Sequence, residues 1–257
     1  MTSSVSDMES RRLEKRLKER FVKAMATYHL IEDDDKILVG LSGGKDSLLL
    51  TELLAKRARI QHPRFSVEAI HVRMENIHYE TDTSYLQQFC DSLGVPLHVR
   101  TTSFETSVIS TEMTNKDRRR QKQPCFLCSW NRRKQLFNLA QELGCNKIAL
   151  GHHQDDLIHT ALMNLTYQAH FATMPAKLKM RKMPLTIIRP LCLIPESDIK
   201  TWAEIQGYQK QQKLCPYETN SHRTDIKQLY DTLEQMNPEV RYNIWGALEA
   251  DNKLIEE

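Results

Sequence analysis

The chain has 257 residues, 40% of them hydrophobic and 27% charged, a length that suits one large domain or one domain with a small appendage. It holds no stretch of the ~18 consecutive apolar residues that a membrane span needs, and no apolar signal-peptide segment near its start. The net charge is +3, but residues 116–134 hold eight basic side chains against one acid, and residues 177–189 hold five against none. Two such segments favour a polyanionic partner, although two solvated loop surfaces would give the same pattern.

These features predict a cytoplasmic protein with no membrane partner. In that compartment the six cysteines are expected to be thiols, ligands or redox groups rather than disulfides. Cys90, Cys145 and Cys192 lie within or beside apolar segments, so we expect them to be buried and inert.

The hydrophobic pattern predicts an amphipathic helix over residues 8–30, followed by strands that alternate with helices. We expect strands at 36–41, 65–72, 96–101, 146–150 and 185–188, helices at 47–57, 83–93, 125–143, 155–167 and 195–207, and a helical tail from residue 222. This alternation predicts βαβ units and a parallel sheet with helices on both faces. Ligands bind such sheets at the carboxyl ends of the strands, which are the turns after Leu41, Val72 and Leu150.

The turn after the first expected strand has the composition of an anion-binding loop. Its glycines let the backbone approach a ligand, and the helix that follows offers N–H donors and a positive dipole end. A lysine adds a point charge, and the spacing is not that of a Walker A loop. The residues of this turn are Ser42, Gly43, Gly44, Lys45, Asp46 and Ser47.

Two further segments carry groups that could do chemistry. Cys125 and Cys128 form a C-x-x-C pair at the start of a helix, which fits zinc, an iron–sulfur cluster, a redox pair or two core residues. The fourth expected strand runs into Gly-His-His-Gln-Asp-Asp, residues 151–156, which would be a metal site or a polar helix cap. Zinc on cysteines together with His152 or His153 is one reading of these segments.

Taken in order, these segments resemble the tRNA 2-thiocytidine synthetase (TtcA) family of the PP-loop ATP pyrophosphatase superfamily over roughly residues 35–230. The matching pieces are S-G-G-K-D-S, the C-x-x-C helix with Arg132-Arg133, A-L-G-H-H with the aspartate pair, Met174-Pro175 with Lys177-Leu178, Ile188-Arg189-Pro190-Leu191, and a late cysteine. The resemblance implies an α/β fold with a parallel-sheet, PP-loop (adenine nucleotide alpha hydrolase-like), Rossmann-type domain. We expect an N-terminal helix at 1–34, the ATP-binding catalytic domain at 35–210 and a C-terminal helical segment at 211–257.

The resemblance further implies an ATP-dependent tRNA sulfurtransferase that adenylates a tRNA base, a cytidine at its C2 oxygen, and replaces that oxygen with sulfur. It implies ATP, Mg²⁺ and a [4Fe-4S] cluster as cofactors, tRNA as partner, and a sulfur donor such as a cysteine desulfurase or free sulfide, with a homodimer as one option. The cluster ligands by this pattern are Cys125, Cys128 and Cys215.

The expected roles of the other residues follow the same pattern. ATP contacts are expected from residues 42–47, from His71 and from Gly151, and catalytic roles from Asp46, Arg132, Asp155 and Asp156. The basic segments are expected to bind RNA through Arg118, Arg119, Arg120, Lys122, Lys177 and Lys179.

The sequence departs from the family pattern where RNA or the activated base is expected: at His159, Gln168-Ala169-His170, Gln212 and Pro216-Tyr217-Glu218. These departures leave the target nucleotide open. The alternatives are another PP-loop ligase such as a lysidine-type tRNA enzyme or an amidotransferase-like synthetase, a thiolase or desulfidase acting on another nucleotide or free base, and a non-catalytic zinc-containing RNA-binding protein.

Overall fold

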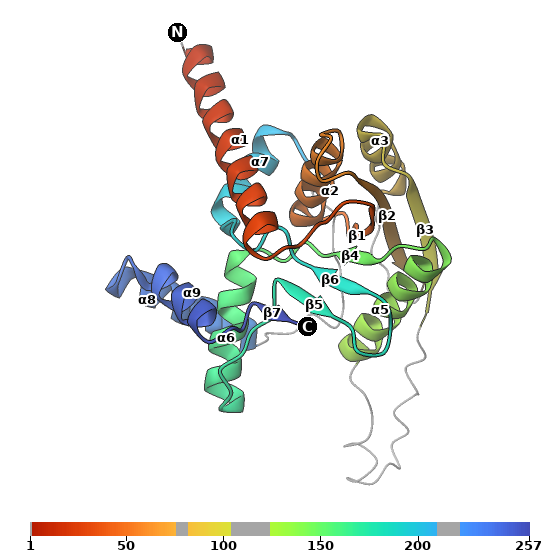
Figure 1. The fold of residues 1–257 in the computed structure, drawn as a ribbon. Coiled ribbons are helices and arrows are strands. Elements are labelled where there is room, and N and C mark those ends of the chain that lie inside the picture. The colour runs from red at the N-terminus through yellow and green to blue at the C-terminus, as the bar shows by residue number, and fades with distance from the viewer. Residues whose placement is uncertain (1, 76–81, 104–123, 210–221) are drawn as a thin grey trace, which may run out of the picture.

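The computed structural model describes residues 2–75, 82–103, 124–209 and 222–257 (Figure 1). In chain order the elements are α1 (Thr2–Thr27), β1 (Asp35–Gly40), α2 (Lys45–Ala58), β2 (Phe65–Met74), α3 (Thr83–Leu93), β3 (Leu97–Thr102), α5 (Pro124–Glu142), β4 (Lys147–Ala149), α6 (Gln154–Gln168), β5 (Lys177–Lys179), β6 (Thr186–Ile188), α7 (Glu196–Ile205), α8 (His222–Met236), α9 (Val240–Ala250) and β7 (Ile255–Glu256). The expected strands and helices are confirmed, with ends shifted by a few residues. The short strands β5 and β7 were not expected from the sequence.

The strands form one sheet in the order β3-β2-β1-β4-β6-β5-β7. It is parallel, as expected, except that β5 runs antiparallel to β6. Successive strands move outward from β1 through β2 to β3, whereas β4 lies on the other side of β1. The strand order therefore reverses between β1 and β4. In open α/β sheets a ligand binds outside the carboxyl ends of the strands at such a point.

Alternate residues of β1 enter two different cores because successive side chains of a strand point to opposite faces. Ile37 and Val39 join the larger cluster, which contains side chains of α1, α2 and α3. Leu38 joins a smaller cluster with Leu139 and Ala140 of α5. Helices thus cover both faces of the sheet, as the sequence predicts.

The larger core extends from α1 to the last strand. It contains Leu13, Leu17 and Phe21 of α1, and also Trp245 and Leu254 near the other end of the chain. Figure 1 shows α8 and α9 beside α6, on the side of the molecule away from α3 and β3. The division at 34/35 and 210/211 stays a prediction.

No helix in the described part of the chain is long and apolar enough to cross a membrane. The expectation for three cysteines is confirmed, since Cys90, Cys145 and Cys192 are buried free thiols. Burial raises the pKa of Cys90 to about 12 and that of Cys145 to about 11, so neither thiol is reactive at neutral pH.

Candidate active site

The anion-binding turn connects the carboxyl end of β1 to the first residue of α2, as the sequence predicts. Gly43 has φ +83°, a left-handed conformation that a side chain would strain. The Ser42 hydroxyl accepts a hydrogen bond from the Gly44 N–H at 3.3 Å, and the Ser47 hydroxyl donates to the Gly44 carbonyl at 2.9 Å. The loop is therefore held by its own serines, with the amino end of α2 open toward a ligand.

Gly151, at the end of β4, packs directly against this loop. A Cβ atom at residue 151 would lie 3.1 Å from both the Asp46 carbonyl carbon and the Ser47 nitrogen. Only a glycine lets the two backbones come this close. Gly151 therefore brings the Gly-His-His-Gln-Asp-Asp segment beside the PP-loop, whether or not it also contacts ATP.

His71 contacts the backbone immediately before the PP-loop. The side chain is 1% exposed, and its Nδ1 lies 2.8 Å from the carbonyl oxygen of Leu41, the residue that precedes the loop. Burial lowers the pKa of His71, and the nearby charge of Arg132 adds to this effect. The imidazole is thus neutral. A direct contact of this residue with ATP stays a prediction.

Lys45 lies between two carboxylates. Its Nζ is 3.0 Å from Asp46 Oδ1 and 3.2 Å from Glu196 Oε1. Burial disfavours the charge on Lys45, but Asp46 and Glu196 outweigh it and raise its pKa. Apart from the Lys45 ion pair, Asp46 Oδ1 is shielded from solvent and accepts no hydrogen bond from the described residues. A carboxylate oxygen in this state suits a magnesium ion that bridges to phosphate.

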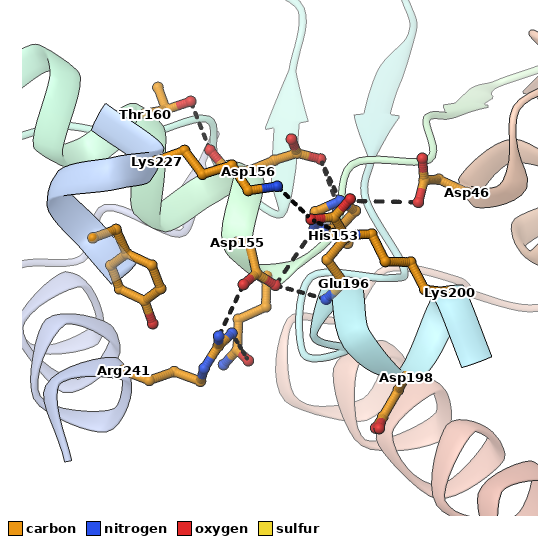
Figure 2. A network of polar contacts seen from close by, with 12 residues as sticks. Asp46, His153, Asp155, Asp156, Thr160, Glu196, Asp198, Lys200, Lys227 and Arg241 are labelled. Carbon is orange, nitrogen blue, oxygen red and sulfur yellow. Dashed lines mark hydrogen bonds and ion pairs between the residues drawn. The ribbon is translucent and has the colours of Figure 1, made fainter. Parts of the chain in front are cut away.

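His153 connects the PP-loop to the aspartate pair (Figure 2). Its Nε2 lies 3.9 Å from Asp46 and 3.5 Å from Asp156, and its Nδ1 lies 3.6 Å from Asp155. Burial disfavours the imidazolium, but the three carboxylates outweigh it and raise the pKa of His153. This residue links three acidic side chains that favour its protonated form, whereas zinc ligation needs the neutral imidazole.

The two aspartates differ sharply in environment. Asp155 is 7% exposed, and both of its oxygens are occupied. Oδ1 accepts a hydrogen bond from Arg241 at 2.8 Å, and Oδ2 accepts one from the Glu196 backbone N–H at 2.7 Å. Burial raises the pKa of Asp155, but His153 and Arg241 outweigh that effect and hold it far below its usual range.

Asp156 is more open, with its side chain 39% exposed. One oxygen, Oδ2, accepts the His153 backbone N–H at 3.1 Å as a helix cap. Its carboxylate therefore faces the space beside the PP-loop, where a substrate or metal ion could reach it. Asp155 is therefore a buried residue that holds structural elements together, whereas Asp156 is accessible to a ligand.

His152 has the opposite character to its neighbour. Burial, with the charge of Arg189, lowers its pKa to about 4, and its Nδ1 accepts a hydrogen bond from Arg189 Nε at 3.3 Å. Burial and the charge of Arg133 lower the pKa of Arg189 to about 10. Arg133 and Arg189 thus both bring positive charge toward the carboxyl edge of the sheet.

The C-x-x-C pair falls in the first turn of α5, where the sequence predicts it. Cys128 is half-buried, and so is Arg132 one turn further on. Residues at i and i+4 share one helix face, and the charge of Arg132 contributes to the lowered pKa of His71 in β2. Cys215 and the side chain of Cys125 lie outside what the structure describes, so the ligand set stays a prediction.

The basic segments are described only in part. Lys179 is exposed on β5, whereas Lys177 is half-buried with its Nζ 3.9 Å from Glu257. On α5, Trp130 is 52% exposed and Lys134 Nζ lies 5.6 Å from the centre of its ring, a surface suited to stacking on a nucleobase. The expected RNA contacts Arg118, Arg119, Arg120 and Lys122 lie outside the described residues.

Three residues of this site were missed by sequence reasoning: Glu196, Lys227 and Arg241. Glu196 could have been noticed in the sequence, because it follows Pro195 at the start of a helix. An acidic side chain at that position is stabilised by the positive end of the helix dipole. Arg241 and Lys227 lie on helices whose pattern shows only solvent-facing charge, and nothing in the sequence indicates their partners. In the described part of the chain no group of three or more His, Cys, Asp or Glu side chains could hold a metal ion on its own.

The fold and the loop together define a PP-loop domain, in which a parallel sheet presents an anion-binding turn at its point of strand-order reversal. A family described as the PP-loop domain matches residues 10–226. The tRNA-cytidine(32) 2-sulfurtransferase of Bordetella avium is 34% identical over 93% of this chain and 74% of its own length. That of Saccharophagus degradans is 33% identical over the whole chain and 83% of its own length.

A solved structure, the U34-tRNA thiolase NcsA from Methanococcus maripaludis with its [4Fe-4S] cluster, superposes with a TM-score of 0.72 at 25% identity. It covers 94% of this chain and 79% of that one. The chain therefore belongs to the PP-loop family and, within it, to the family of the tRNA-cytidine 2-sulfurtransferases.

Proposed function

We propose that this protein is an ATP-dependent tRNA sulfurtransferase that converts a tRNA cytidine to 2-thiocytidine. The observation that carries this proposal is the contact between the PP-loop and the Gly151 segment, which sets an ATP-binding loop beside an accessible carboxylate. Relatives named for this reaction align over nearly the whole chain.

The PP-loop residues 42–47 would hold the pyrophosphate part of ATP. The base oxygen attacks the α-phosphorus, a new P–O bond forms, and pyrophosphate leaves. Lys45 and the N–H groups at the start of α2 stabilise the negative charge that develops on the leaving group. The adenylated oxygen is then a good leaving group, and it departs with AMP when sulfide attacks C2.

Asp46 and Asp156 are the residues that would hold Mg²⁺. Asp46 offers a shielded oxygen that faces Lys45 at 3.0 Å, and Asp156 offers an accessible one. The ion would neutralise the phosphates while His153 keeps the two carboxylates from repelling each other. Asp155 positions this group but does not itself meet the substrate.

Cys125, Cys128 and Cys215 would hold a [4Fe-4S] cluster, and the solved neighbour contains a cluster of that type. Two cysteines at i and i+3 in one helical turn share a face, which suits ligation of one group. Held by these three cysteines, such a cluster would supply an iron to which sulfide could bind. Arg132, on the same face as Cys128, would contact developing charge on the nucleotide.

The tRNA would lie across the carboxyl edge of the sheet. Lys179, Arg133 and the exposed Trp130 of α5 lie on surfaces that could meet its backbone and bases, together with the basic residues 118–122. The target base must be unstacked to reach ATP. A cysteine desulfurase or free sulfide would supply the sulfur, the protein would act in the cytoplasm, and a homodimer is compatible with this scheme.

The decisive experiment is nucleoside mass spectrometry of tRNA from cells with and without the gene, complemented with wild type or with Asp46→Ala. We expect 2-thiocytidine to disappear in the deletion and to return only with the wild-type gene. Loss of 2-thiouridine instead would move the target to uridine. An unchanged set of thiolated nucleosides would overturn the proposed function.

A further inference from the structure

Glu196 joins the PP-loop to the C-terminal helices. Its Oε1 lies 3.2 Å from Nζ of Lys45 in the PP-loop, and its Oε2 lies 3.2 Å from Nζ of Lys227 on α8. Lys200, one turn further along α7, lies 3.2 Å from the same Oε2. One carboxylate therefore contacts three ammonium groups from three elements, and Figure 2 shows two of these residues, Lys200 and Lys227, beside Glu196.

The position of Glu196 is fixed through its backbone. Its N–H donates to Asp155 Oδ2 at 2.7 Å, and Asp155 in turn binds Arg241 of α9. Its side chain is 20% exposed. The carboxylate can redistribute its charge among the lysines without moving its backbone.

Helix α8 docks through buried side chains and through ion pairs, one of which joins its Glu234 to Arg241 of α9 at 2.9 Å. Ile226 and Tyr230 are its buried side chains, and the Tyr230 ring meets that of His159 on α6 at a centroid distance of 5.1 Å. Lys227 lies one residue from Ile226, on the part of α8 nearest the active site. A change in its ion pair with Glu196 therefore acts directly on the docking of this helix.

The local charge balance makes the carboxylate responsive to phosphate. With no ligand, Glu196 shares its single negative charge among Lys45, Lys200 and Lys227. The phosphate oxygens of ATP compete with Glu196 for Lys45 because the triphosphate group as a whole carries more negative charge than one carboxylate. Once Lys45 turns to phosphate, Glu196 interacts more strongly with the two remaining lysines, and the carboxylate is never left without a partner.

We propose that Glu196 is a positioning residue that couples ATP binding at the PP-loop to the docking of α8 through Lys227. The coupling rests on the proposed use of ATP at this loop, but not on the identity of the thiolated base. Coupling between two sites is reciprocal. If bound ATP favours the docked position of α8 by a certain factor, then loss of the Glu196–Lys227 pair lowers the affinity for ATP by the same factor. Partly exposed ion pairs are weak, so we expect a factor of about two to five.

Amide hydrogen exchange of the full-length, anaerobically purified protein measures this coupling. The probe is Mg²⁺ with an ATP analogue whose α,β-bridging oxygen is replaced by methylene, which binds without turnover. In wild type the analogue should slow exchange in α8 by about two- to fivefold. Glu196→Gln and Lys227→Met should lose this slowing, and Lys227→Met should raise the Kd of the analogue by the same factor.

Lys200→Met is the matched control. It removes the same charge from the same oxygen at the same distance, but Lys200 belongs to the helix that carries Glu196 and not to α8. This variant should retain the slowing in α8. Equal effects of Lys200→Met and Lys227→Met on exchange in α8 would show that only the loss of a positive charge matters, and would overturn the coupling.

Wild type that binds the analogue with no change in α8 would also overturn the coupling, and would leave the proposed function intact. Wild type that binds no analogue at all would overturn ATP use at the PP-loop, and with it both proposals. Thermal unfolding of each variant without ligand shows that the fold is retained.

Discussion

The carboxylate of Asp155 is bonded to the guanidinium of Arg241 at 2.8 Å, which ties the start of α6 to α9. Arg241 also reaches Glu234 of α8 at 2.9 Å and lies with its guanidinium carbon 5.5 Å from the centre of the Tyr230 ring. Burial alone would lower the pKa of Arg241, but the interaction with Asp155 outweighs burial, and the pKa is raised. The first aspartate of the pair thus holds the C-terminal helices to the start of α6.

This arrangement predicts that substitution of Asp155 mainly lowers stability, whereas substitution of Asp156 mainly lowers activity. Asp155→Asn removes the buried carboxylate that faces both Arg241 and His153 and leaves Arg241 with only the more exposed Glu234, and we expect a loss of about 3 kcal/mol in the free energy of unfolding. Asp156→Asn should change stability by less than about 1 kcal/mol but reduce pyrophosphate release at least about tenfold. Urea unfolding and a pyrophosphate assay test both. The assignment of roles would be reversed if Asp155→Asn were stable and inactive while Asp156→Asn were unstable and active.

Gly151→Ala should weaken ATP binding through backbone overlap alone. A methyl group 3.1 Å from two backbone atoms of the PP-loop must push the loop away, which costs on the order of 1–3 kcal/mol. We expect a matching loss of about tenfold or more in ATP affinity, measured by calorimetry. Gly246→Ala in α9 is the control, because a Cβ there has no neighbour within 4 Å. Unaltered ATP affinity in Gly151→Ala would contradict the proposed overlap.

The buried cysteines should be dispensable for iron binding. Cys128→Ser should lose most of the iron of the anaerobically purified protein, since thiolates are the usual ligands of such clusters. Cys90→Ser should keep its iron, because that thiol is buried away from α5 with a pKa raised to about 12 by burial. Iron analysis and the visible absorption spectrum distinguish the two. A colourless wild type with one zinc per chain would refute the cluster.

Glu196 should make stability depend on acid pH. Burial raises its pKa, but Lys45, Lys227 and Lys200 outweigh that effect and lower it to about 2, against 4.5 for the free side chain. A lowered carboxyl pKa contributes stability that is present above pH 4.5 and is lost as the pH falls toward 2. Allowing for partial exposure, Glu196→Gln should cost about 1 kcal/mol at pH 7, and about a quarter of that near pH 2.5.

Urea unfolding of wild type and Glu196→Gln at several pH values measures this difference. A constant difference between pH 7 and pH 2.5 would show that the carboxylate charge plays no part in stability.

The basic segment 116–122 should set the salt dependence of tRNA binding. Neutralising Arg118, Arg119 and Arg120 together should weaken tRNA binding and lower the salt slope by roughly one unit for each phosphate that the protein no longer neutralises. ATP affinity and iron content should stay the same. The control neutralises Arg11, Arg12 and Lys23, exposed residues of α1, whose amino end projects away from the sheet (Figure 1). Equal slopes for both triple variants would leave the segment without a specific role.

Local sequence was enough to predict the fold class and the position of the PP-loop. The strand β1, the Gly-Gly turn and α2 follow one another within residues 35–58, so apolar periodicity and turn chemistry reveal them directly. Cys90 and Cys192 were likewise predicted correctly as buried thiols from the apolar residues around them. The short strands β5 (Lys-Leu-Lys) and β7 (Ile-Glu) escaped prediction because each contains a single apolar residue, whereas the equally short β4 and β6 lie in apolar runs.

The tertiary structure alone decided which acids of the site are accessible. Asp155 and Asp156 are neighbours with the same side chain, and the sequence offers no reason to separate them. They differ because Arg241, 86 residues away, pairs with the first, while the second stays open beside the PP-loop. Glu196 owes its role in the same way to Lys45 and Lys227. Ion pairs between distant segments leave no periodic signal, since their geometry exists only once the sheet and its helices have packed.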